Sequence, residues 1–173
     1  DAAPAALAGW CRTQFGLYHA TDDKAAERTR AQQLTDRAAA LDPLGDPLVL
    51  TARGTVAMGR GQRQEADALL ARARAIDPGF GWAWERSAWV CTNFGEPVSA
   101  LTLFQRAIAL KGPRAPMANC FVGIGAALYS AGRYEKSVRW IKRAMAENPR
   151  AAWFNRLLAP SLLMLDEHQA ARA

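Results

Sequence analysis

The sequence predicts an all-α protein built from antiparallel helix pairs. Alanine and leucine dominate its apolar residues, whereas valine and isoleucine are scarce, and this balance favours helices over strands. Small residues recur along the chain at intervals of 34, 37 and 34 residues, at Gly54, Ala88, Gly125 and Ala159. A period of this length indicates stacked helix pairs that together bury one continuous core.

Three further columns of residues keep the same spacing, and prolines close the units. The columns are Ala66, Ala100, Ser137 and Ala171; Leu70, Phe104 and Ile141; and Ala73, Ala107 and Ala144. Pro43, Pro78 and Pro149 end their units, because proline cannot continue a helix. Each unit therefore has small and large residues at the same positions as the unit before it.

The first unit spans about residues 3–43 and is the least regular. Pro4 suits the first turn of a helix. A polar link at residues 21–23 then leads into a second helix over residues 24–41, which ends at Asp42-Pro43.

The later units repeat the pattern with shorter links. They span about residues 46–78, 80–112 and 114–149, and their helix pairs are joined at Gly61, Gly95 and Gly132. The predicted helices of the second and third units cover residues 46–59, 62–76, 80–93 and 96–110. An insertion of three residues within 111–116 explains the single interval of 37.

Residues 150–173 read as a truncated fifth unit. Its first helix is predicted over residues 150–165, and residues 167–173 begin the partner helix. We therefore expect one repeat domain over residues 1–173, with about four and a half units. Because the chain starts at Asp1 without methionine, we expect it to be a fragment of a larger protein.

The pattern of reactive residues argues against an enzyme, a metal site or a cofactor. Cys11, Cys91 and Cys120 are odd in number and far apart, which favours free thiols in a reducing cytoplasm. His19 and His168 lie at opposite ends of the array, and Asp166-Glu-His168 lacks a second histidine at zinc-ligand spacing.

Two glycine pairs have the spacing of a phosphate loop but not its context. The segments Gly123-Ile-Gly125 and Gly59-Arg-Gly61 lack a following Gly-Lys-Ser/Thr. Their glycines already have packing and turn roles, so no phosphate site is predicted there.

The chain is basic, with a net charge of +6 and a pI near 9.7, but its cations are spread along it. One helix concentrates them, at Arg133, Lys136, Arg139, Lys142 and Arg143. This side could dock an acidic partner or nucleic acid. Alternatively, it is the solvated face opposite the buried stripe of Ser137, Ile141 and Ala144. The second interpretation is favoured, so no direct nucleic-acid contact is expected. No membrane span is expected either, because the longest apolar run, 157–165, contains Pro160 and Ser161.

The columns carry a resemblance to a known repeat family. The matching residues are Gly54, Ala66, Leu70, Ala73 and Pro78; Trp84, Ala88, Gly95, Ala100, Phe104 and Ala107; and Gly125, Gly132, Tyr134, Ile141, Ala144 and Pro149. They resemble tetratricopeptide (TPR) repeats. The resemblance implies a right-handed superhelical solenoid whose first helices line a concave groove.

A narrower resemblance rests on four segments, which are residues 82–89, 121–127, 132–135 and 152–160. They are similar to the C-terminal TPR regions of bacterial signalling proteins that carry a winged-helix DNA-binding domain or an adenylate cyclase domain. This resemblance implies a regulatory module, in a transcriptional regulator, that holds a peptide or domain. The alternative is a dimerisation or sensory arm of a multidomain adenylate cyclase.

Equivalent positions on the first helices give the candidate groove residues. They are Leu48, Thr51, Thr55, Trp82, Glu85, Trp89, Asn119, Val122, Tyr129, Trp153 and Arg156. Aromatic side chains exposed on such a face are typical binding anchors. The tryptophans could equally be covered by parts of the parent protein. The lysine and asparagine pattern with which some TPR domains clamp a carboxyl terminus is absent.

Two expectations concern exposure. Trp84 should point toward a neighbouring helix as core, while Trp82 and Trp89, seven residues apart, share the groove side. At the C-terminal end, uncovered leucines should support a homodimer, namely Leu158, Leu162 and Leu165.

Overall fold

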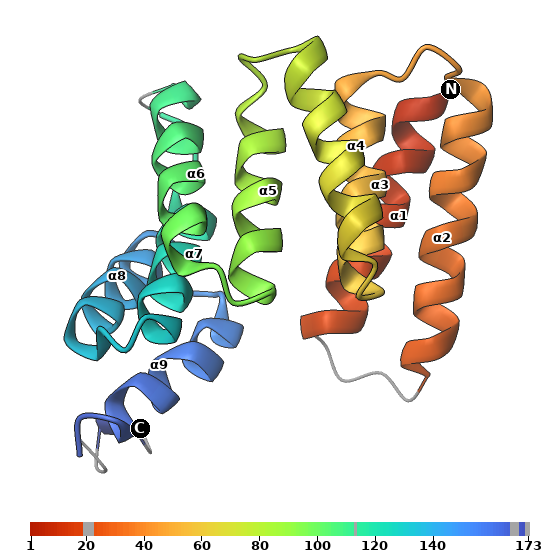
Figure 1. Ribbon diagram of the computed structural model, residues 1–173. Coiled ribbons are helices and arrows are strands. Elements are labelled where there is room, and N and C mark those ends of the chain that lie inside the picture. Colours follow the sequence, from red (N-terminus) through yellow and green to blue (C-terminus); the bar gives the residue numbers. More distant parts are fainter. Residues whose placement is uncertain (19–22, 113, 167–169, 172–173) are drawn as a thin grey trace. The chain divides into compact units, whose positions relative to one another are not determined.

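The computed structural model describes residues 1–18, 23–112, 114–166 and 170–171, and within them every regular element is a helix (Figure 1). The helices are α1 (Ala2–Tyr18), α2 (Lys24–Leu41), α3 (Pro47–Gly59), α4 (Arg63–Ile76), α5 (Gly81–Asn93), α6 (Pro97–Leu110), α7 (Ala118–Ser130), α8 (Tyr134–Glu147) and α9 (Asn155–Leu163). The predicted all-α fold class is confirmed. Two compact units form, Asp1–Val90 (unit 1) and Cys91–Ala173 (unit 2).

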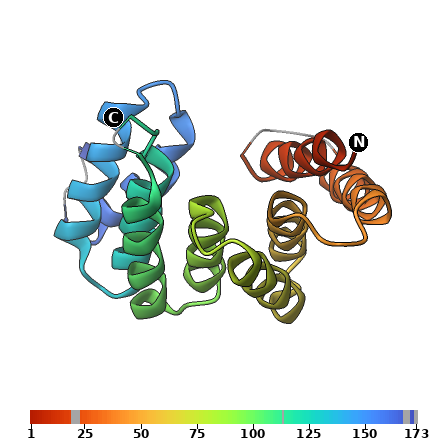
Figure 2. The same ribbon diagram turned by 90° about the horizontal axis from the view of Figure 1, so that it is seen from above.

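Unit 1 contains α1 to α4 and most of α5. In Figures 1 and 2, α1 and α2 lie side by side as an antiparallel pair. Asp23 caps α2 by accepting a 2.8 Å hydrogen bond from the Ala26 amide, and Asp46 caps α3 through the Leu48 amide at 2.7 Å. Pro47 then occupies the first turn of α3, where its missing N–H costs nothing.

Two apolar clusters hold unit 1 together. Ala6, Ala38, Val49 and Ala52 form the cluster between α1, α2 and α3. Leu50, Ala73 and Ala83 form the cluster between α3, α4 and α5. Small residues dominate both clusters, so the helices pack closely and the larger side chains gather at the edges.

Unit 2 depends on glycines in α7. A Cβ placed on Gly123 would lie 2.1 Å from Phe104 Cζ, and one on Gly125 would lie 2.5 Å from Ile141 Cγ1. Phe104 and Ile141 are fully buried. Gly125 and Ile141, which belong to the small and large columns of the sequence, are therefore in direct contact between α7 and α8.

The predicted columns are buried throughout the second to fourth repeats. Ser137, which stands in an alanine column, is also fully buried. Its hydroxyl donates to the Gly125 carbonyl at 2.8 Å and lies 3.0 Å from the Ser161 hydroxyl. Ser137 therefore connects α7, α8 and α9 through polar contacts that alanine cannot make.

The helix boundaries follow the prediction closely, and α2 spans the predicted residues 24–41. The last repeat differs, because residues 152–154 form a short 3-10 helix before α9 begins at Asn155. Pro160 lies inside α9 and lacks the N–H that would close one helical hydrogen bond. The predicted link at 21–22 and most of the helix predicted over 167–173 lie outside the described residues.

Candidate functional site

Candidate residues of unit 1 come together around Trp82. The rings of Trp10 and Trp82 meet edge to face, with centroids 5.4 Å apart, and Phe80 meets Trp82 in the same way at 6.1 Å. Leu48 and both tryptophans pack on the cluster between α1, α2 and α3. We call Trp10, Leu48, Phe80 and Trp82 the tryptophan face; all four are half-buried and so retain surface open to solvent.

The polar candidates of unit 1 are buried. The Thr55 hydroxyl donates to the Thr51 carbonyl at 2.9 Å, and both side chains are inaccessible to solvent. Glu85 forms an ion pair with its neighbour Arg86, and each is only 4% exposed. A buried ion pair is weak evidence for stability, because desolvating two charges offsets much of their attraction.

Some buried polar atoms of the described residues have no hydrogen-bond partner. They are Trp10 Nε1, Thr51 Oγ1 and Arg86 Nε. These atoms come from α1, α3 and α5, the first helices of three consecutive repeats. Each buried polar atom without a partner costs about 1–3 kcal/mol, so the burial of these atoms opposes folding of unit 1.

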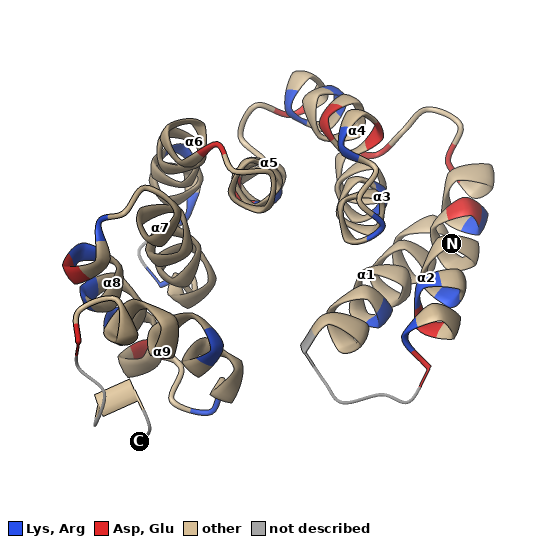
Figure 3. Cartoon of the chain, turned by 60° about the horizontal axis from the view of Figure 1, so that its bottom comes forward, with Lys and Arg blue, Asp and Glu red and all other residues tan. Residues whose placement is uncertain are grey.

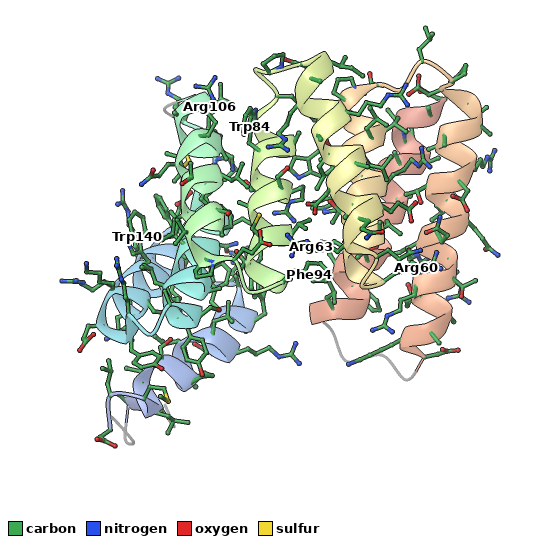
Figure 4. The ribbon with its side chains drawn as sticks, viewed as in Figure 1. Arg60, Arg63, Trp84, Phe94, Arg106 and Trp140 are labelled. Carbon is green, nitrogen blue, oxygen red and sulfur yellow. The ribbon has the colours of Figure 1, made fainter. Side chains whose placement is uncertain are left out.

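The structure reverses the expected burial of two tryptophans. Trp89 is 6% exposed, whereas Trp84 is half-buried. The Trp84 indole donates to the Pro78 carbonyl at 3.0 Å, and the Arg74 guanidinium of α4 lies 4.8 Å from its ring centroid (Figure 4). Trp84 thus points toward the neighbouring helix as expected, but at the edge of the core. Helical spacing fixes the side a residue occupies and not its depth.

The candidates of unit 2 differ widely in exposure. Val122 is fully buried, Asn119 is half-buried and Arg156 is exposed. Tyr129 packs against Tyr134 with ring centroids 5.5 Å apart, and Trp153 packs against Phe154 at 4.6 Å. These are two separate aromatic pairs, unlike the shared cluster around Trp82.

The basic side of α8 is exposed to solvent, and Figure 3 marks the Lys and Arg positions along that helix. Its residues are Arg133, Lys136, Arg139, Lys142 and Arg143. The Arg143 guanidinium lies 4.2 Å from the Phe121 ring centroid and 5.3 Å from that of Trp140. One cation of this face therefore covers aromatic rings of α7 and α8, which is a packing role.

Metal-ligating residues do not cluster in the part of the chain that the structure describes. His19 and His168 lie outside it, so the expectation about them is not addressed by the structure. Cys11 is exposed, whereas Cys91 and Cys120 are buried. Among the described helices, none has both the length and the apolar character to cross a bilayer.

Sequence reasoning missed three residues of this region. Trp10 lies in the irregular first repeat, which the columns do not align, and Phe80 precedes the predicted groove positions. Arg86 was detectable, since a long charged residue stands where the equivalent positions hold Ala52 and Gly123.

Comparison with solved structures identifies the architecture. MamA residues 41 to the end from Desulfovibrio magneticus RS-1 matches with a TM-score of 0.65 and 18% identity, over 97% of this chain and 89% of that one. Pseudomonas aeruginosa PilF matches at 0.68 and 16%, over 98% and 74%. PilW, described as a type IV pilus biogenesis factor, matches at 0.69 and 16%, over 94% and 77%.

No protein-family model and no curated protein sequence matches the chain. At identities of 16–18%, the structural matches establish the fold and nothing further. These neighbours are TPR-repeat proteins. The chain therefore has the tetratricopeptide-repeat fold.

Proposed function

We propose that the chain is a protein-interaction module that holds a peptide or protein segment against the tryptophan face of unit 1. The observation that carries this proposal is the cluster of half-buried aromatic rings around Trp82. Tryptophan anchors bury a large apolar area with few rotatable bonds, which makes them frequent centres of binding energy. The fold supports the proposal, because stacked first helices present an extended surface.

The unpartnered polar atoms of unit 1 are not part of the proposed contact surface. Trp10 Nε1 and Arg86 Nε are donors without partners in the described chain. Both nitrogen atoms are inaccessible to solvent, so a segment bound on this surface would contact the exposed parts of the rings and not these donors. The partly exposed rings therefore favour a segment that places apolar side chains against them.

We further propose a regulatory role in a bacterial signalling protein, with a transcriptional regulator preferred. This step rests on the sequence resemblance of residues 82–89, 121–127, 132–135 and 152–160. In such a protein, occupancy of the module would control a separate output domain. We infer a cytoplasmic location from the odd number and wide spacing of the cysteines, and we assign no catalytic role to the module.

The test begins with a peptide selected on the full chain from a random display library. Its Kd is then measured with the wild type and with Trp82→Ala, which should weaken binding by about 30-fold, equivalent to about 2 kcal/mol. Trp140→Ala removes a half-buried tryptophan of α8 and is the matched control, with an expected change below about twofold. Equal losses in the two variants, or loss in Trp140→Ala alone, would refute the proposed surface.

The second candidate function is a dimerisation or sensory arm of a multidomain adenylate cyclase. At the end of α9, Leu163 and Met164 are 49% and 52% exposed. The leucines that were expected to be uncovered are not the exposed ones, since Leu162 is 2% exposed and Leu158 and Leu165 are half-buried. Sedimentation equilibrium tests the dimerisation arm: a dimer that Leu163→Glu converts to monomer favours it, and a wild-type monomer excludes it.

A further inference from the structure

A second surface of unit 1 is lined by hydrogen-bond donors. A hollow of about 440 Å³ lies between α2 and the end of α3, lined by Ala25, Arg28, Thr29, Gln32, Gln33 and Arg60. Figure 4 places Arg60 at the turn between α3 and α4, beside α2. A much smaller hollow of about 10 Å³ shares Arg28 and Arg60 and adds Arg12 and Lys24 to its lining. We call the larger space the α2 hollow.

The charge around the α2 hollow is unbalanced. Arg28 and Arg60 are exposed, and neither forms an ion pair in the described part of the chain. The neighbouring acid, Glu27, is buried and already receives Arg12 at 3.2 Å and Arg30 at 3.0 Å. Figure 3 marks Lys and Arg positions on α1, α2 and α3. The described lining of the hollow is therefore positive, because it contains two arginines and no acidic residue.

The remaining acids of α2 are also engaged. Asp23 caps the helix through the Ala26 amide, and Asp36 accepts a 2.7 Å hydrogen bond from Gln32 Nε2. Two arginines that face one space repel each other unless an anion lies between them. Planar guanidinium groups bind carboxylates through paired hydrogen bonds, and the Gln33 amide adds a further donor, whereas the Thr29 hydroxyl already donates to the Ala25 carbonyl at 3.1 Å.

We propose that the α2 hollow binds an acidic peptide segment of a protein partner, whose carboxylates are received by Arg28 and Arg60. The volume lies within the range of about 300–1,000 Å³ that is usual for ligand sites, and it exceeds what a single small anion fills. The site is separate from the tryptophan face, since the two share no lining residue. The proposal for the α2 hollow can therefore be tested independently of the proposed function.

The test is fluorescence anisotropy of fluorescein-labelled hexaglutamate with the full chain, with hexaglutamine as the neutral probe. Wild type should bind hexaglutamate and not hexaglutamine, and binding should weaken with added salt. Arg28→Gln and Arg60→Gln should each weaken binding by about tenfold or more, as expected for a lost charge-assisted pair. Arg37→Gln, an exposed arginine of α2 that does not line the hollow, should change it by less than about twofold.

Each other result overturns the proposal. Failure of hexaglutamate to bind, or equal losses in Arg28→Gln and Arg37→Gln, removes the hollow as the site. Binding of inorganic phosphate in calorimetry without binding of hexaglutamate makes it a small-anion site instead. Thermal melts by circular dichroism show that the variants fold, and Trp82→Ala should retain hexaglutamate binding, which separates this site from the tryptophan face.

Discussion

Replacing Gly125 with alanine should destabilise unit 2, because the new methyl group has no room. Its Cβ would lie 2.5 Å from Ile141 Cγ1 and 3.3 Å from the Ser137 carbonyl oxygen. Ile141 is fully buried, so it cannot move into solvent to relieve the contact. Overpacking of this kind costs about 1–3 kcal/mol, whereas alanine in place of glycine returns about 1 kcal/mol of helix propensity. The net loss should reach about 2 kcal/mol.

Urea unfolding followed by circular dichroism measures this change as a shift of the midpoint. Gly16→Ala is the matched control, since its Cβ would lie 3.5 Å from Glu27 Cβ, an ordinary contact. That variant should gain up to about 1 kcal/mol from helix propensity alone. Gly125→Leu should lose more than Gly125→Ala. If Gly125→Ala were as stable as the wild type, the close packing of α7 on α8 would be wrong.

Two further predictions concern burial and hydrogen bonding. Trp89→Ala should cost about 3–5 kcal/mol as a buried large-to-small change. Trp84→Ala should cost about 1–2 kcal/mol, since it removes one indole hydrogen bond and the contact with Arg74; equal melting of the two variants would contradict the burial assignment. Ser137→Ala should cost about 1 kcal/mol by leaving the Gly125 carbonyl without its hydroxyl donor, and a melting temperature at or above that of the wild type would argue against this bond.

Most of the fold could be predicted because each position of the repeat occurs several times in the sequence, and its equivalents agree. Gly125 alone is compatible with a turn, but its alignment with Gly54 and Ala88 indicates a close helix contact. The structure has that contact against Ile141, and the equivalent one in unit 1 against Leu70. The 3-10 helix of the last repeat could not be predicted, because this repeat is incomplete and has no full set of equivalent positions with which to align it.

The candidate site could be predicted only in part. Leu48 and Trp82 were assigned to the first-helix side, and both pack against the cluster between α1, α2 and α3. Periodicity gave no information on depth, so Trp89 and Trp84 were expected in each other's environment. Trp10 was missed because side-chain contacts between α1 and α5 depend on tertiary packing, which an irregular repeat does not reveal.

The tryptophan face is tested most directly by two-dimensional ¹H–¹⁵N NMR of the indole N–H groups. The chain has six tryptophans, so each side chain reports through one signal. During titration with the selected peptide, the Trp10 and Trp82 signals should shift and the Trp140 signal should stay in place. Shifts of Trp140 with Trp10 and Trp82 unchanged would contradict binding at the tryptophan face.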